Sequence, residues 1–263
     1  MNTINICIGH KNFPIKFVKY IDLFIAPVIS INYPRLAYVP DNINGENGHA
    51  LSEYSQLLWL YKNIDSIAKD KSFVRIFHYR RFISVYRYEN SITALNSPWT
   101  QIITETNLNN CIDDFKRNNS NELYNTRVKF NSNLLNLYSE THVLEDLLLF
   151  TNFLLDQKIF DKKLALDFLN SEYLIPACNI GLFSITNFKK IYSILEKAAN
   201  FIYSSSFNLR TGYQRRSLGF LLERLHSFLI LKYMQDNLIE SNFGVNYLIS
   251  NEHSVTLTSD RVE

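Results

Sequence analysis

Cysteine is scarce in this sequence, and the cysteines that occur follow no disulfide or metal-binding pattern. Cys7, Cys111 and Cys178 are odd in number and widely spaced, and no two of them form a Cys-x-x-Cys pair. The pattern indicates neither a disulfide scaffold nor a zinc knuckle, and it fits a reducing compartment. We therefore expect a cytoplasmic protein.

Long apolar runs are also lacking. The two most apolar stretches, residues 17–31 and 147–155, carry polar interruptions and fall short of the ~20 residues that span a bilayer. Residues 1–6 have neither the basic segment nor the small-residue cleavage site of a secretory signal. We expect no membrane-spanning segment and no export.

Charge of one sign does not dominate, because 27 Lys and Arg residues face 25 Asp and Glu residues. The net charge of +2 does not predict a surface built for a polyanion, so nucleic acid is not the expected partner. With 46% hydrophobic residues over 263 positions, the composition is that of a globular protein. We expect one domain over residues 1–250 and a loosely held polar tail at 251–263.

Strand and helix patterns alternate along the chain, which indicates an α/β fold. Strand patterns occupy residues 3–8, 36–39 and 73–77, with an extended segment at 173–183. Helical spacing of apolar residues occurs at 51–64, 143–157, 162–169, 188–203 and from about 215 onward. Turn-forming residues at 41–48 predict a mobile loop, and residues 85–135 give no clear pattern.

A basic cluster follows the strand predicted at 73–77, and it comprises His78, Tyr79, Arg80 and Arg81. Open α/β sheets bind ligands at the carboxyl ends of their strands, and arginine binds phosphate bidentately. The cluster therefore predicts a pyrophosphate site. The alternative is that the arginines only solvate the end of the strand.

Three further residues are candidates for the same site. His10 and Lys11 follow the first predicted strand, where this class of fold receives a nucleotide, although they could be an ordinary surface pair. Glu53 stands at the start of the helix predicted at 51–64. It could orient the basic cluster or simply complement the helix dipole.

Five motifs, in order along the chain, resemble a bacterial family of capsular-polysaccharide and lipopolysaccharide glycosyltransferases known largely as a domain of unknown function. They are Gly-His-Lys within residues 4–13, the helix at 52–63, His-Tyr-Arg-Arg-Phe at 78–82, the segment 178–183, and residues 213–225 with Gly-Phe-Leu-Leu-Glu-Arg-Leu. The resemblance covers most of the chain. The sequence departs from the family pattern at Tyr54, Gln56, Cys178 and Ile180.

The resemblance implies a GT-A-like fold, with a mostly parallel central sheet flanked by helices and a helix-rich C-terminal half. It implies a hexosyltransferase that takes a nucleotide-sugar donor, in the first instance a UDP-sugar, and extends a glycan or lipid-linked glycan. The donor-binding half would lie at about 1–135 and the acceptor-side half at about 136–250. Because a lipid-linked acceptor lies at the inner face of the cytoplasmic membrane, we expect at most peripheral contact with the membrane.

Many GT-A enzymes hold the donor pyrophosphate through a metal bound by Asp-x-Asp, and this sequence contains no Asp-x-Asp. Cationic side chains can instead neutralise the leaving diphosphate. We therefore predict metal-independent transfer without a cofactor, in which Arg80 and Arg81 are catalytic. The paired acids at 113–114 and 145–146 could still supply a metal ligand.

Glu223 is the candidate catalytic base for the acceptor hydroxyl. It lies off the apolar stripe of the last predicted helix, formed by Leu218, Leu221, Leu222, Leu225, Phe228 and Leu229. The alternative is a helix-stabilising ion pair with Arg216 or Arg224. His142 and His226 are further candidates for the base. The candidates for the acceptor or sugar side are Asn179, Gly181, Arg216 and Arg224.

Two other functions fit the same residues. A non-catalytic carbohydrate- or nucleotide-binding module would use the same cluster without turnover. A nucleic-acid-binding protein would use Arg80, Arg81, Arg215 and Arg216, and its affinity would depend strongly on salt.

Overall fold

The computed structural model describes residues 2–9, 15–27, 35–39, 48–89, 91–95, 97–112, 121–237 and 242–250. Several predicted features lie outside these residues. They are the donor-site candidates His10 and Lys11, the loop at 41–47, the acids Asp113 and Asp114, and the tail at 251–263.

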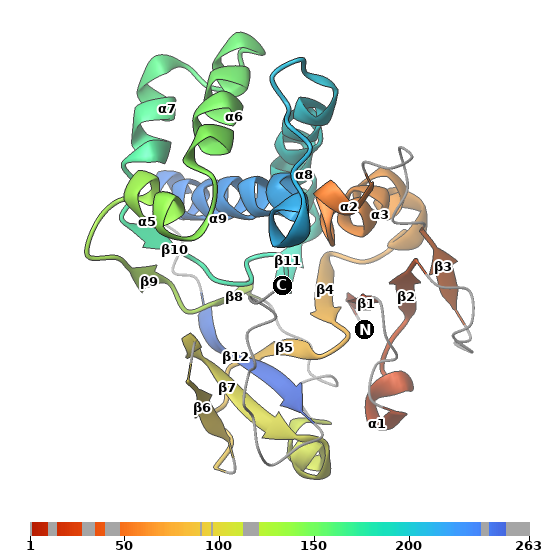
Figure 1. Cartoon of the computed structure of the whole chain (residues 1–263). Helices are drawn as coiled ribbons and strands as arrows, with labels where there is room; N and C mark the ends of the chain where they lie inside the picture. The colour runs from red at the N-terminus through yellow and green to blue at the C-terminus, as the bar shows by residue number, and fades with distance from the viewer. Residues whose placement is uncertain are drawn as a thin grey trace.

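A ten-stranded sheet forms the centre of the described structure (Figure 1), in the order β3-β2-β1-β4-β11-β8-β12-β7-β6, with β5 pairing with β4 and β12 off this path. Its strands are β1 (Thr3–Ile8), β2 (Leu23–Ala26), β3 (Leu36–Tyr38), β4 (Phe73–His78), β5 (Arg81–Ser84), β6 (Ile92–Ala94), β7 (Ser97–Thr104), β8 (Leu123–Asn125), β11 (Gly181–Ser184) and β12 (Asn242–Ser250). A separate two-stranded sheet pairs β9 (Val128–Lys129) with β10 (Tyr173–Leu174).

The sheet is mixed, so the prediction of a mostly parallel sheet is wrong. The strands β3, β2, β1 and β4 are parallel neighbours, whereas β11 runs antiparallel to both β4 and β8. A parallel connection needs a crossover of a dozen or more residues. Only residues 79 and 80 separate β4 from β5, so these two strands form an antiparallel hairpin.

Helices gather mainly on one side of the sheet, where α5 to α9 and the pair α2 and α3 appear in Figure 1. The α-helices are α1 (Ile15–Val18), α2 (Gly48–Leu51), α3 (Tyr54–Ile67), α5 (Leu134–Thr141), α6 (Leu144–Asp156), α7 (Lys162–Leu169), α8 (Ile185–Ala199) and α9 (Ser217–Asn237). Short 3₁₀ helices add η2 (Glu105–Cys111), η3 (Asn200–Tyr203) and η4 (Gly212–Arg216). The C-terminal half is therefore rich in helices, as predicted, although β10, β11 and β12 also lie there.

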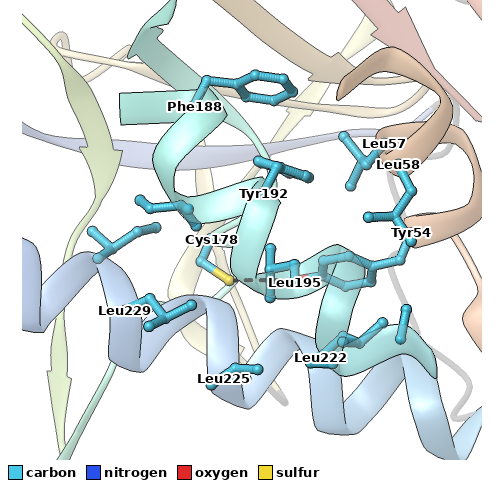
Figure 2. Packing of buried hydrophobic residues seen from close by; sticks show 14 of the residues in the cluster. Tyr54, Leu57, Leu58, Cys178, Phe188, Tyr192, Leu195, Leu222, Leu225 and Leu229 are labelled. Carbon is cyan, nitrogen blue, oxygen red and sulfur yellow. Dashed lines mark hydrogen bonds between the residues drawn. The ribbon is translucent and has the colours of Figure 1, made fainter. Parts of the chain in front are cut away.

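The main core lies between the sheet and the helices α3, α8 and α9. Every residue of the apolar stripe predicted on α9 is buried. Figure 2 shows Leu222, Leu225 and Leu229 of this stripe near Tyr54 of α3 and Tyr192 of α8. A second cluster on the other face of the sheet packs α1 and η2 through Phe17 and Leu108.

All three cysteines are free and buried, and none of them forms a disulfide bond. In the described part of the chain, no helix is both long and apolar enough to cross a bilayer.

The helix predicted at 51–64 is interrupted. α2 ends at Leu51 and α3 begins at Tyr54, and Ser52 between them has a left-handed φ of 52°. Gly219 of α9 packs against this break, since a Cβ there would lie 2.9 Å from Ser52 Cβ and 3.2 Å from the Leu51 carbonyl oxygen. Close packing of two backbones therefore explains the glycine inside α9.

Gly219→Val is expected to destabilise the protein by about 1–3 kcal/mol, because the added methyl groups have no room against the break between α2 and α3. Thermal or urea unfolding measures this effect. Gln235→Val is the matched control, since it adds the same β-branched side chain to α9 at an exposed position. Equal stability of the two variants would contradict the packing argument.

Candidate functional site

A cavity of about 430 Å³ lies where the end of β4 meets the start of α3 and the first half of α9. Eight of the predicted site residues line it, namely Glu53, His78, Tyr79, Arg80, Arg81, Asn179, Arg216 and Glu223. The remaining lining residues are Ser52, Tyr54, Ala177, Tyr213, Arg215, Gly219 and Phe220. The cavity thus joins four segments that are far apart in the sequence.

The basic cluster forms the tight turn between β4 and β5, and backbone hydrogen bonds hold it in place. His78 pairs with Arg81 across the hairpin. The Tyr79 amide donates to the Ile8 carbonyl of β1 at 2.9 Å, and the Ile249 amide of β12 donates to the Arg80 carbonyl at 2.8 Å. The two arginines therefore project from a turn whose backbone is held on both sides.

The two arginines differ in exposure. Arg80 is exposed, and its guanidinium lies 5.5 Å from the centroid of the Tyr79 ring. Arg81 is half-buried, and within the described residues its Nε has no hydrogen-bond partner. Burial and the neighbouring Arg80 charge lower the pKa of Arg81, although it stays protonated at neutral pH. Arg81 is thus a cation with an unused donor at the cavity.

Glu53 connects the basic turn to the segment around residue 179. Its Oε1 lies 2.8 Å from His78 Nε2, and its Oε2 accepts a hydrogen bond from Asn179 Nδ2 at 3.2 Å. Its side chain makes no capping hydrogen bond to α3. Of the two roles predicted for Glu53, this geometry fits orientation of the basic cluster.

The ionisation of this pair follows from its surroundings. Burial alone would raise the pKa of Glu53, but His78 and the charges of Arg216 and Arg81 outweigh it and hold the pKa well below its ordinary value. Burial, with Arg81 and Arg80 nearby, lowers the pKa of His78 despite the opposing effect of Glu53. At neutral pH, Glu53 is therefore a carboxylate and His78 a neutral imidazole.

Glu223 lines the same cavity from α9, and its side chain is about one-third exposed. Its Oε2 lies 3.5 Å from Arg224 Nη1. Arg216 instead donates to Ser52 Oγ at 2.7 and 3.2 Å. Of the two ion pairs considered from the sequence, the structure thus forms the one with Arg224.

Two of the predicted acceptor-side residues do not line the cavity. Arg224 lies beside it, with a largely buried side chain. Gly181 has a φ of 145°, and a Cβ there would lie 2.4 Å from the Leu123 carbonyl oxygen of β8. Close approach of two strands, rather than room for a sugar, explains this glycine.

Some of the lining residues were not predicted as site residues, among them Ser52, Ala177, Tyr213 and Phe220. Ser52 and Ala177 have left-handed φ values of 52° and 49°, and non-glycine residues rarely adopt this conformation. Such strained residues cluster at functional sites. No sequence signal marks this strain, whereas Tyr213 and Phe220 fall within the motif at 213–225 and could have been considered.

A buried polar network lies beneath the cavity. The hydroxyl group of Tyr54 is 3.2 Å from His226 Nδ1 and 4.0 Å from Cys178 Sγ, the contact drawn in Figure 2. The Cys178 thiol donates to the Glu223 carbonyl at 3.4 Å. The network therefore links α3, the segment before Asn179 and α9 beneath the site.

His226 is expected to make stability depend on pH. Burial lowers its pKa to about 3, whereas an unfolded histidine titrates near 6.5. Between these values the unfolded state binds more protons, so the free energy of unfolding is highest above pH 6.5 and falls as the pH decreases toward 3. This group contributes up to about 1.4 kcal/mol per pH unit.

Urea unfolding at several pH values between 7 and 4 tests this expectation. His226→Gln should reduce the slope of the free energy of unfolding against pH by up to about 1.4 kcal/mol per pH unit, the contribution of one titrating group. An unchanged slope would show that His226 is not the neutral, buried group described here.

Metal-binding groups are sparse around the site. Within the described residues, no three His, Cys, Asp or Glu side chains gather in a position to hold a metal ion. The paired acids Glu145 and Asp146 lie outside the cavity lining, and each accepts a 2.8 Å hydrogen bond from Arg210.

The protein has an α/β fold, and a cavity lined by basic residues lies at the carboxyl end of the central strand β4. The chain belongs to the family described as Domain of unknown function (DUF4422), which matches residues 6–235. Among solved structures it is similar to the WbbM bifunctional glycosyltransferase in its apo form, with a TM-score of 0.67 and 15% identity over 96% of this chain and 46% of that chain. The chain thus spans about half the length of that protein, and the likeness shows the fold. No curated protein matches the sequence.

Proposed function

We propose that this protein is a hexosyltransferase with a GT-A-like fold that transfers a sugar from a nucleotide-sugar donor, with UDP-sugars as the first candidates, to a growing bacterial surface polysaccharide. The observation that carries the proposal is the convergence of Arg80, Arg81 and Glu223 on one cavity. The similarity in fold to a bifunctional glycosyltransferase supports it.

The basic turn is the proposed binding site of the donor diphosphate. During transfer the bond between the anomeric carbon and the diphosphate oxygen breaks, and negative charge develops on the leaving nucleoside diphosphate. Arg80 and Arg81 can stabilise that charge without reorganising, because β1 and β12 hold the turn between them. The contact between Glu53 and His78 holds the turn against the start of α3.

The acceptor side of the proposed site is centred on Glu223. In an inverting transfer, an acceptor hydroxyl forms the new bond to the anomeric carbon and gives its proton to a carboxylate. Glu223 lines the cavity and is partly exposed, so it can reach such a hydroxyl. Asn179 and Arg216 line the same cavity and offer hydrogen-bond donors to sugar hydroxyls.

Metal-independent catalysis is part of the proposal, since fixed guanidinium groups can carry out the charge neutralisation that a divalent cation performs elsewhere. The test is slow hydrolysis of UDP-, GDP-, CMP- and dTDP-sugars by the purified protein without acceptor, with EDTA or with Mn²⁺. Hydrolysis of one nucleotide class in EDTA supports the proposal. Activity lost in EDTA and restored by Mn²⁺ would overturn the metal-independent step.

Binding measurements made alongside the hydrolysis assay separate the alternative functions. A non-catalytic module would show a melting-temperature shift with a nucleotide sugar but no hydrolysis, since a ligand that binds only the folded state stabilises it. A nucleic-acid-binding protein would show strongly salt-dependent affinity for DNA or RNA and no response to nucleotide sugars.

A further inference from the structure

Three aromatic rings stack beside the proposed catalytic base. Tyr213 of η4 and Phe220 of α9 both line the cavity, and their ring centroids are 5.0 Å apart with planes at 30°. The ring of His142, which follows α5, lies 4.3 Å from Phe220 at 25° and 6.2 Å from Tyr213 at 10°. The His142 and Tyr213 rings are therefore nearly parallel, and the Phe220 ring is tilted by 25° and 30° to them.

The short segment that carries Tyr213 is held on two sides. Gln214 Nε2 donates to the Thr141 carbonyl at 3.3 Å, and its Oε1 lies 3.4 Å from His142 Nδ1. On the other side, Arg216 donates to Ser52 at the break between α2 and α3. These contacts hold the segment that carries Tyr213, and the rings of Phe220 and His142 pack against the Tyr213 ring.

Tyr213 combines these contacts with exposure. Tyr213 is 41% exposed as a residue, whereas Phe220 is 8% exposed. An aromatic ring that is both held in place and accessible to solvent leaves apolar area free for a ligand, and such area is typical of binding pockets.

We propose that Tyr213, backed by Phe220 and His142, is a stacking platform for the terminal pyranose ring of the acceptor. The face of an aromatic ring is electron-rich, and it attracts the C–H groups on the apolar face of a pyranose. Glu223 lies three residues after Phe220 on the same side of α9, so a stacked sugar presents a hydroxyl near the base. This inference rests on the proposed function, because it assigns the acceptor subsite of the same cavity.

The kinetic test compares Tyr213→Ala, Tyr213→Phe and Tyr203→Ala. Tyr203 is the matched control, since it is 65% exposed and does not line this cavity. The donor is the nucleotide sugar that the protein hydrolyses in the absence of acceptor. The acceptors are a panel of methyl glycopyranosides. Tyr213→Ala should raise the KM of the accepted glycoside about twofold to tenfold, and more than the KM of the donor, because the contact with the aromatic ring is lost.

Tyr213→Phe should restore a KM near that of the original protein, and Tyr203→Ala should leave it unchanged. A larger rise in the KM of the donor than in that of the glycoside would place the nucleobase on the platform and overturn the proposal. Unchanged KM values in Tyr213→Ala would overturn it as well.

A binding experiment separates failure of this inference from failure of the proposed function. Tyr213→Trp places a fluorescent ring at the same position, and it can be titrated with methyl glycopyranosides and, separately, with UDP. An emission change with a glycoside supports the platform even if no nucleotide sugar is hydrolysed. A change with UDP alone, or with neither ligand, would overturn it.

Discussion

Arg81→Ala is expected to lower the rate of donor hydrolysis by about 10²- to 10³-fold, the usual cost of removing one preorganised group that stabilises charge in the transition state. Arg81 is half-buried beside Glu53, and its Nε has no partner within the described residues. Arg81 lines the cavity, so its guanidinium group can donate to a phosphate oxygen bound there. Steady-state hydrolysis of the preferred nucleotide sugar measures the effect.

Two further variants separate catalysis from stability. Arg81→Lys keeps the charge but loses the guanidinium fork, so its rate should lie between those of the original protein and Arg81→Ala. Arg127→Ala is the control, because Arg127 lies over the Tyr173 ring outside this cavity. If the Arg81→Ala variant is folded and hydrolyses the donor at an unchanged rate, the basic turn has no role in the proposed mechanism.

Glu223→Gln is expected to lower transfer to an acceptor by about 10²- to 10⁴-fold, the range that general-base catalysis contributes. The amide keeps the size of the side chain but cannot take the proton of the acceptor hydroxyl. Binding of the donor should persist, because the basic turn stays intact. Transfer rates and the melting-temperature shift with donor are the two measurements.

Glu196→Gln on α8 is the matched control for this substitution. Glu196 pairs with Lys62 at 3.1 Å and does not line the cavity, so transfer should be unaffected. If Glu223→Gln retains transfer but has a lower melting temperature, then the carboxylate serves only the ion pair with Arg224.

The secondary structure around the site was largely predictable from local patterns. The apolar run at 73–77 predicted β4, and the apolar stripe from 218 to 229 predicted the buried face of α9. Such patterns depend on which neighbouring residues are apolar, and the chain carries that information directly. The rule that ligands bind at strand ends then identified the basic cluster as a candidate site.

The direction of strand pairing was not predictable in the same way. Gly181 and its neighbours were recognised as extended, but an extended segment pairs equally well in either direction. Only the route of the chain through the helices brings β11 antiparallel to β4 and β8. For the same reason, the role of Gly181 became clear only once Leu123 was seen to lie against it.

The apolar patterns of the main helices and strands follow directly from the residue order, and so do the available chemical groups, including the two arginines after β4 and Glu223 in the last helix. Which of these groups meet depends on the packing of the elements. Glu53 contacts His78 and Asn179, Gly219 packs on the break at Ser52, and Tyr213 joins Phe220 beside the base. The contact between Ser52 and Gly219 joins positions 167 residues apart, and packing of the whole core, rather than local preference, brings such positions together.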